Sequence, residues 1–170
     1  MNKIILLIAL TVTSMVTNAQ SFFDSLEDMD GVDMVVVNKD MFELLSKFGP
    51  DKMKDNEAMQ IFTMIRDLKN LKVFSTDDAI IADKMETMAN SAIKKHNLTE
   101  LMRIKEDDSR IKIYVKSTKN KEYVSEVLMF IKGIDKQTKG ISKSMIVSLT
   151  GNIDINKLSA LADTFTEKNK

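Results

Sequence analysis

The sequence predicts an α+β fold, with a mixed five-stranded sheet and amphipathic helices mainly on one face. At four places an apolar strand-like run passes through polar capping residues into a helical pattern. Each helical pattern has a single apolar face, and a hairpin pattern lies near the middle of the chain. A three-layer α/β arrangement is the alternative, because the all-apolar run at 35–37 is typical of a strand buried on both faces.

The first half of the chain alternates between helix and strand patterns, after a short segment around residues 22–26. Residues 35–37 predict a strand, and the helix that follows ends at Gly49 and Pro50. A second helical pattern leads to another strand at 71–74. The apolar stripes of these two helices are Met41, Leu44, Leu45 and Phe48 in the first, and Ala58, Ile61, Phe62, Ile65 and Leu68 in the second.

A third helix follows the second strand. The polar run at 75–78 caps its N-terminus, with carboxylates where the helix dipole is positive. His96 and Asn97 end it. Its apolar stripe consists of Ile81, Met85, Met88 and Ala92.

The clearest hairpin signal joins the segments 98–105 and 110–116 through the turn 106–109. In the second segment apolar and polar residues alternate, which indicates a strand with one buried and one solvated face. The apolar positions are Ile111, Ile113 and Val115, and the polar ones are Lys112, Tyr114 and Lys116.

The last third of the chain predicts a helix, a strand and a final helix. Gly133 follows the first of these helices, and a polar loop at 134–143 leads to a strand at 145–150 that Gly151 and Asn152 break. The predicted order is therefore β-α-α-β-α-β-β-α-β-α. The helical stripes are Val124, Val127, Leu128 and Ile131, and Leu158, Leu161, Ala162 and Phe165.

Residues 1–19 have the pattern of a cleavable signal peptide. Lys3 precedes an apolar run, and the small residue Ala19 before Gln20 suits signal peptidase. The apolar core of about ten residues is roughly half of the ~20 needed to cross a bilayer, which disfavours a membrane anchor. We therefore expect cleavage after Ala19, with one soluble domain over 20–170 in the periplasm or secreted, and no transmembrane segment after cleavage.

Composition excludes several classes of protein. The chain has no cysteine, which rules out a lipoprotein anchor at the cleavage site, disulfides and thiolate metal sites. Its 25 Lys and Arg residues balance 25 Asp and Glu residues, so there is no electrostatic drive toward nucleic acid. A hydrophobic content of 44% is that of a globular chain, and stability must come from its core.

Segments along nearly the whole chain resemble a known family. They are Ala19-Gln20, Phe22-Phe23, Gly31-Val32, the strand–helix pattern at 35–48, the run at 101–104 and the run at 149–154. This pattern is similar to the domain of unknown function 4252 (DUF4252), a family of small exported proteins from Bacteroidota. The resemblance implies an exported protein and suggests a role in the cell envelope. The family has no established activity, substrate or catalytic residues to carry over.

Candidate catalytic residues all have structural interpretations. His96 lies at a helix C-terminus, where a cation complements the dipole. Ser91 and Lys94 match the S-x-x-K spacing, but they lie within an amphipathic helix and have no companion motif. The paired carboxylates that could act as acid and base fall in a helix cap and a turn, at Asp77-Asp78 and Asp107-Asp108.

Candidate binding residues are also explained by structure. The spacing of Met85 and Met88 could present two thioethers to Cu(I), but both residues lie on an apolar helix stripe. An acidic cluster around Gly31 does not match the spacing of an EF-hand, and a basic cluster is typical of a solvated edge. The acidic cluster is Asp24, Glu27, Asp28, Asp30 and Asp33, and the basic one is Lys116, Lys119 and Lys121.

The sequence thus predicts no catalytic, cofactor-binding or metal-binding residue. It favours an exported, non-enzymatic interaction or accessory module whose partner is an unknown protein or envelope component. Two alternatives stay open. One is a hydrolase of unrecognised type, which needs a pocket with converging ionisable residues. The other is a carrier of small apolar ligands, which needs an enclosed cavity lined by Met and Phe.

Overall fold

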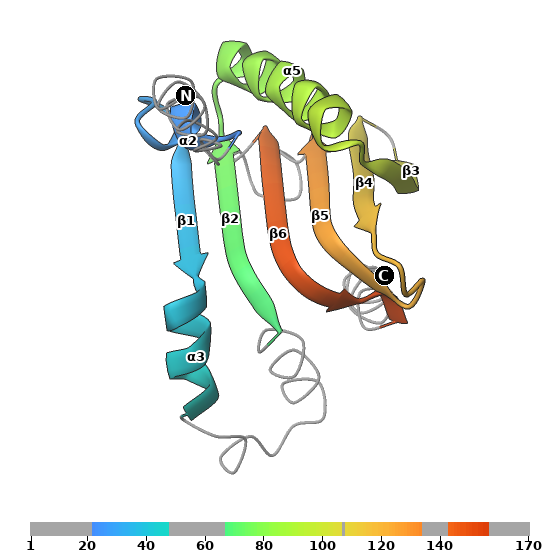
Figure 1. The fold of residues 1–170 in the computed structure, drawn as a ribbon. Helices are drawn as coiled ribbons and strands as arrows, with labels where there is room; N and C mark the ends of the chain where they lie inside the picture. The colour runs from blue at the N-terminus through green and yellow to red at the C-terminus, as the bar shows by residue number, and fades with distance from the viewer. Residues whose placement is uncertain (1–21, 48–66, 107, 134–142, 157–170) are drawn as a thin grey trace, which may run out of the picture.

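The computed structural model describes residues 22–47, 67–106, 108–133 and 143–156. These residues form a six-stranded sheet in the order β1-β2-β6-β5-β4-β3, with one long helix across it (Figure 1). The elements are α2 (Asp24–Glu27), β1 (Asp33–Asn38), α3 (Lys39–Lys47), β2 (Leu68–Thr76), α5 (Ala79–His96), β3 (Thr99–Glu106), β4 (Ser109–Ser117), β5 (Tyr123–Lys132) and β6 (Ser144–Asp154).

Every strand pairing in this sheet is antiparallel. The α+β class is confirmed in outline, but the predicted sheet of five strands with mixed directions is wrong. The strands β3 to β6 follow one another along the chain and in space, while β2 pairs with β6 from far along the chain. Strands β3 to β6 thus pair with their neighbours along the chain, whereas β1–β2 and β2–β6 pair across longer connections.

Strand β5 replaces the helix that the apolar spacing over 124–131 predicts. Its Val127 pairs with Val115 on one side and Leu149 on the other, so β5 lies inside the sheet. An interior strand buries side chains on both faces and therefore has no polar alternation. Such an apolar run fits a helical stripe and a buried strand equally well, which is why the spacing misleads.

Strands β2 and β6 both extend further than the sequence pattern suggests. Leu68 was expected to end a helix, but it starts β2, where it is buried and pairs with Gly151. Gly151 likewise does not break β6, which continues to Asp154. A Cβ atom at Gly151 would lie 2.5 Å from the Asp67 carbonyl oxygen, so glycine lets the two strands approach closely at an irregularity in their register.

Helix α5 confirms the predicted caps and apolar stripe. The Asp78 carboxylate accepts hydrogen bonds from the backbone N–H groups of Ile80 and Ile81, at 2.7 and 3.0 Å. Asn97 ends the helix in the left-handed conformation, with φ of 54°. The helix buries Ala82, Met85, Ala89 and Ala92, and the core on this face of the sheet also contains Phe74, Leu98, Leu128, Phe130 and Ile146.

The opposite face of the sheet has a core of its own. Side chains alternate along a strand, so Val115 and Val127 point away from their neighbours Tyr114 and Leu128, which lie on the α5 side. Phe42 of α3 is buried in this second core. The buried members are Phe42, Leu68, Val115, Val124, Val127 and Ile153.

Strand β1 lies at one edge of the sheet (Figure 1). Its run of valines predicted a strand buried on both faces, and that interpretation is wrong. The side chains of Val35 and Val36 are 56% and 44% exposed. β-Branched residues such as valine favour strands both at the edge and in the middle of a sheet. The run of valines therefore indicates that a strand forms, but not that it is buried.

The short helix α2 is held against the sheet by both apolar and ionic contacts. Phe23 and Leu26 are buried in the core beneath α5. The Lys72 ammonium of β2 lies 3.0 Å from an Asp24 oxygen and 2.6 Å from a Glu27 oxygen. This arrangement fixes the start of the described chain on the α5 side of the sheet.

Several predicted segments lie wholly or mostly outside the described residues: the leader at 1–19, the helix end at Gly49 and Pro50, the helix over 58–68, the loop at 134–143 and the final helix at 158–165. Within the described part, no helix has the combination of length and hydrophobicity that crossing a bilayer requires.

Candidate functional site: a cationic cleft beside helix α5

Three cations lie in one row across three neighbouring strands. In the strand register Lys105 of β3 is opposite Arg110 of β4, and Arg110 is opposite Lys132 of β5. Residues opposite one another on adjacent strands point to the same face of the sheet. Lys132 points to the face that α5 covers, because its ammonium contacts that helix. The row therefore faces α5.

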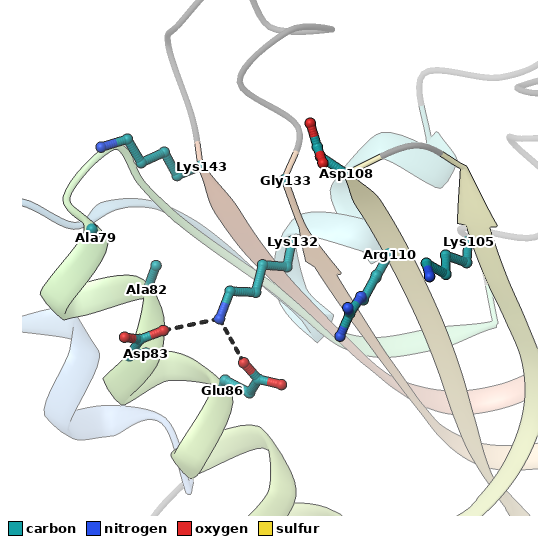
Figure 2. A pocket seen from close by; sticks show the side chains of 10 residues that line it. All are labelled: Ala79, Ala82, Asp83, Glu86, Lys105, Asp108, Arg110, Lys132, Gly133 and Lys143. Carbon is teal, nitrogen blue, oxygen red and sulfur yellow. Dashed lines mark hydrogen bonds and ion pairs between the residues drawn. The ribbon is translucent and has the colours of Figure 1, made fainter.

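The row borders a cleft of about 580 Å³ between the first half of α5 and one end of the sheet (Figure 2). Two alanines of α5 leave room for it, and charged side chains surround it. Its walls are formed by Ala79, Ala82, Asp83 and Glu86 of α5, and by Lys105, Asp108, Arg110, Lys132, Gly133 and Lys143.

Lys132 connects the sheet to the helix at the centre of the cleft. Its ammonium lies 2.9 Å from a carboxylate oxygen of Asp83 and 2.8 Å from one of Glu86 (Figure 2). Hydrogen bonds to Glu86 and Asp83 raise the pKa of Lys132 above its ordinary value of 10.5. The ammonium therefore stays charged, and both carboxylates already accept a hydrogen bond from it.

Arg110 and Lys105 differ from Lys132 in having no such counter-charge. Neither makes an ion pair with another residue that the structure describes, and both are exposed. The Arg110 side chain extends along the cleft beside Lys132, and Lys105 extends toward Arg110, whereas Lys143 points away over Ala79 (Figure 2). Arg110 and Lys105 are thus the cations of the cleft best placed to receive an external anion.

Backbone contacts fix the position of this row. The Ser109 hydroxyl donates to the Gly133 carbonyl at 2.6 Å, and the Gly133 N–H donates to the Lys143 carbonyl at 2.8 Å. Gly133 has φ of 74°, and a Cβ atom there would collide with the Asp108 backbone. The start of β4 therefore lies tightly against the end of β5, one residue from Arg110 on one side and from Lys132 on the other.

Among the described residues that sequence patterns single out, only Asp108 lines the cleft. The Ser91 hydroxyl donates to the Thr87 carbonyl one turn earlier, so it does not pair with Lys94. Asp78 caps α5 as predicted, and Asp107 lies outside the described residues. The interpretation of Asp78 as a helix cap is therefore confirmed, and Ser91 is an exposed residue within α5.

His96 has a partner that the sequence does not indicate. Its Nδ1 atom lies 2.6 Å from a carboxylate oxygen of Glu126 on β5, and its ring stands edge-on to Phe22 at a centroid distance of 6.2 Å. The Lys95 ammonium lies 5.5 Å from the centre of the same Phe22 ring. His96 therefore joins the last turn of α5 to β5 and to the segment before α2.

The candidate metal ligands of the acidic cluster and of the methionine pair make other contacts in the structure. Asp24 and Glu27 of the acidic cluster contact Lys72, and among the described residues no group of three or more potential ligands of the His, Cys, Asp and Glu types could hold an ion. Met85 is completely buried in the core and Met88 packs against it, as expected for core methionines. The basic residues Lys116, Lys119 and Lys121 are exposed.

The cationic cleft is not predicted by the sequence patterns, although the sequence contains part of its signal. The predicted hairpin places Lys105 and Arg110 on either side of the turn at 106–109, where they become direct neighbours. Lys132 could not be added, because its segment was interpreted as a helix. Asp83 and Glu86 lie outside the predicted apolar stripe of helix α5, and no sequence pattern singles them out.

The fold and the cleft define a small α+β protein with an antiparallel sheet, one covering helix and a charged groove. The family model for a domain of unknown function (DUF4252) matches residues 23–161, which is most of the chain. The chain belongs to this family. Searches of the curated proteins and of the solved structures gave no significant match.

Proposed function

We propose that the protein is an exported, non-enzymatic binding module that receives an anionic group of its partner in the cleft. The observation that carries this proposal is the row of three cations, in which only Lys132 is neutralised within the described structure. The partner group is a carboxylate or a phosphate on a protein or envelope component. The signal-like residues 1–19 support an extracytoplasmic location.

Repulsion among the three cations of the row supports an anion as the ligand of the cleft. Like charges directly opposite one another on adjacent strands repel and destabilise the sheet. Asp83 and Glu86 relieve this repulsion at Lys132. Arg110 lies between two lysines, and no carboxylate in the described part of the chain forms an ion pair with it. The planar guanidinium of arginine donates two parallel hydrogen bonds to a carboxylate or phosphate, and Lys105 adds a second positive charge beside it.

The state of Lys132 supports binding over catalysis. A lysine acts as a general base only when its pKa is lowered, and here hydrogen bonds to Glu86 and Asp83 raise it. Converging ionisable groups do line the cleft, as an unrecognised hydrolase would require, and they are the reason to keep a hydrolase as second candidate. Charged side chains dominate the walls, which does not fit a carrier of apolar ligands.

The test is a titration of the purified protein, expressed from its full-length gene, with inorganic phosphate and with succinate at constant ionic strength. Shifts of amide NMR signals report binding. We expect at least one of the two anions to shift signals of β4 and β5 around Arg110. We further expect Arg110→Gln to weaken that binding roughly tenfold, the loss of a hydrogen bond to a charged group.

Arg103→Gln is the matched control. Arg103 lies next to the row on edge strand β3, is 62% exposed, and is paired with Glu100, but it does not line the cleft. The substitution removes the same charge, so general attraction to the protein falls equally in both variants. Equal weakening by both variants, or no binding of either anion to the unmodified protein, would contradict a specific anion site.

A further inference from the structure

The charged side chains that line the cleft carry one more positive than negative charge. Four of the lining residues are cationic and three carry carboxylates, and groups of both kinds are ordinarily ionised at neutral pH. Lys143 and Asp108, one of each sign, extend away from Arg110, so the surplus near Arg110 is one positive charge with or without them (Figure 2). A singly charged anion therefore neutralises the cleft, whereas a doubly charged anion makes it negative.

The α5 side of the cleft offers an anion no attractive side chain. It consists of Ala79, Ala82, Asp83 and Glu86. Asp83 and Glu86 both contact the Lys132 ammonium, at 2.9 and 2.8 Å, yet their side chains are still 75% and 31% exposed. An anion that enters beside Arg110 consequently meets two methyl groups and two charges of its own sign on the helix.

Carboxylates and phosphates differ in how they fit such a cleft. The guanidinium of arginine donates two parallel hydrogen bonds, which engage both oxygens of a carboxylate but leave a third terminal oxygen on a phosphate monoester. The phosphate monoester also carries a charge of about −1.5 to −2 at pH 7. Held by Arg110, a carboxylate turns only its carbon chain to the rest of the cleft, while a phosphate turns a further charged oxygen to it.

We propose that the cleft binds a single carboxylate group in preference to a phosphate monoester, and that Asp83 and Glu86 determine this specificity. The proposal rests on the anion site proposed above and narrows its ligand to one chemical class. Arg110 and Lys105 attract either anion. The two carboxylates of α5, which Lys132 keeps beside the cleft, repel the second charge and the third oxygen of a phosphate.

A matched pair of small ligands tests the preference. The α-amide of N-acetylglutamate carries one carboxylate, and the amide of N-acetylphosphoserine carries a phosphate monoester on the same kind of backbone. Each is titrated into the purified protein, expressed from its full-length gene, at constant ionic strength and about pH 8, where the phosphate is a dianion. Shifts of amide NMR signals in β4 and β5 report binding. We expect the glutamate ligand to bind at least about threefold more tightly, the effect of one exposed charge.

Substitutions in α5 test which residues determine the preference. Asp83→Asn and Glu86→Gln each remove one negative charge and keep an oxygen that can accept a hydrogen bond from Lys132. Because the energy of a charge–charge contact is proportional to the ligand charge, the gain in affinity for a dianion is the square of the gain for a monoanion. We expect either variant to bind the glutamate ligand about threefold and the phosphoserine ligand about ninefold more tightly. The preference is then lost, and in the double variant it is reversed.

Asp33→Asn is the matched control. Asp33 is exposed and starts β1, three strands away from β5 in the sheet order. Neighbouring strands are about 4.8 Å apart, so three strand spacings are about 14 Å, beyond the screening length of about 8 Å at physiological salt. This variant has the same net charge as Asp83→Asn. We expect its affinity for each ligand to equal that of the unmodified protein.

Two results would overturn the proposal. One is binding of the phosphoserine ligand by the unmodified protein as tightly as the glutamate ligand, or more tightly. The other is an equal gain for both ligands in Asp83→Asn, because the charge of the ligand would then not matter. Unchanged amide signals away from the cleft show that each variant is folded.

Further ligands identify the source of the carboxylate and separate this proposal from the one it rests on. Methyl glucuronide carries a carboxylate on a sugar, and if it binds more tightly than both other ligands it supports the same preference with a glycan as the source. If inorganic phosphate binds but neither carboxylate ligand does, the preference for a carboxylate is overturned and the anion site stands. If no anion binds, the proposed function itself fails.

Discussion

The Lys72 ammonium of β2 lies 2.6 Å from a carboxylate oxygen of Glu27 and so joins the sheet to the short helix α2. Asp24 contacts the same ammonium at 3.0 Å. The Lys72 side chain is only 17% exposed, so this contact is better shielded from solvent than the surface ion pair between Lys39 and Glu43. The stability of the fold and its dependence on pH are expected to rest in part on the Lys72 contacts and on the similar contacts of Lys132.

We expect Lys72→Met to destabilise the folded protein by about 1–2 kcal/mol, between the values typical of exposed and buried ion pairs. The substitution leaves two neighbouring carboxylates without their cation. Urea denaturation followed by circular dichroism measures the change. Lys69→Met on the same strand is the control, because Lys69 is exposed. Equal losses for both variants would show that the ion pairs contribute nothing.

Stability is expected to fall as the pH rises above about 10.5, the unfolded-state value for lysine. Burial opposes the charge on Lys72, but its hydrogen bonds to Glu27 and Asp24 outweigh this effect and raise its pKa, as those to Glu86 and Asp83 do for Lys132. A raised folded-state pKa gives stability that is complete below the unfolded pKa and is lost as the pH rises through the folded one.

Burial and its hydrogen bond to Glu100 raise the pKa of Tyr114, which acts in the same direction. Denaturation midpoints measured across this alkaline range test the prediction. The fall is expected to be smaller in Lys72→Met than in the unmodified protein, since one of the contributing groups is gone. An identical pH profile for the two proteins would exclude Lys72 as a contributor.

Gly133→Ala is expected to be the more disruptive of two matched glycine substitutions. Both Gly133 and Gly31 have positive φ, 74° and 81°, so alanine is strained at either position. At Gly133 the new Cβ meets backbone atoms of Asp108, whereas at Gly31 it meets the end of the flexible Ile81 side chain at 2.8 Å. We expect a loss of roughly 2–4 kcal/mol for Gly133→Ala and about 1 kcal/mol for Gly31→Ala, measured by thermal denaturation.

Met85→Ala tests whether this methionine belongs to the core. Met85 is completely buried beneath α5, and truncation removes its contacts and leaves a cavity, at a cost of about 2–5 kcal/mol. Met34→Ala is the control, since Met34 is 49% exposed, and we expect a change within about 0.5 kcal/mol. Chemical denaturation measures both. A small effect at Met85 would point to a role other than packing.

N-terminal sequencing of the protein recovered from its native cell tests the proposed export. We expect the mature chain to begin at Gln20 and to be found in the periplasmic or extracellular fraction. A chain that retains Met1 would contradict a cleaved leader, and the location of the cleft would then have to be assigned anew.

Local sequence patterns predicted the elements that depend on local interactions. Asp78 and Asn97 mark the two ends of α5 because caps act on the nearest backbone groups. The hairpin of β3 and β4 was likewise visible, since its turn and alternation lie within a short stretch. These features need no knowledge of the rest of the chain.

Features that depend on distant contacts were not predictable in the same way. Val127 and Leu128 belong to a strand because β4 and β6 cover both edges of β5, which no local spacing reveals. Gly151 continues β6 because β2 approaches it from far along the sequence. Predicting the cationic cleft would require knowledge of both local and distant contacts. Lys105 and Arg110 meet across a local turn, but Lys132 lies beside Arg110 only because β4 and β5 pair in the sheet.

The position of β6 has a consequence for how the chain acquires its structure during synthesis. This strand, the last one described, lies between β2 and β5 and connects the two halves of the sheet. Strands β1 and β2 therefore cannot join the sheet of β3, β4 and β5 until residues 144–154 are in place between them. The native sheet is therefore expected to form only after residues 144–154 are available, and slowly for the size of the domain, because its central pairing closes a long loop.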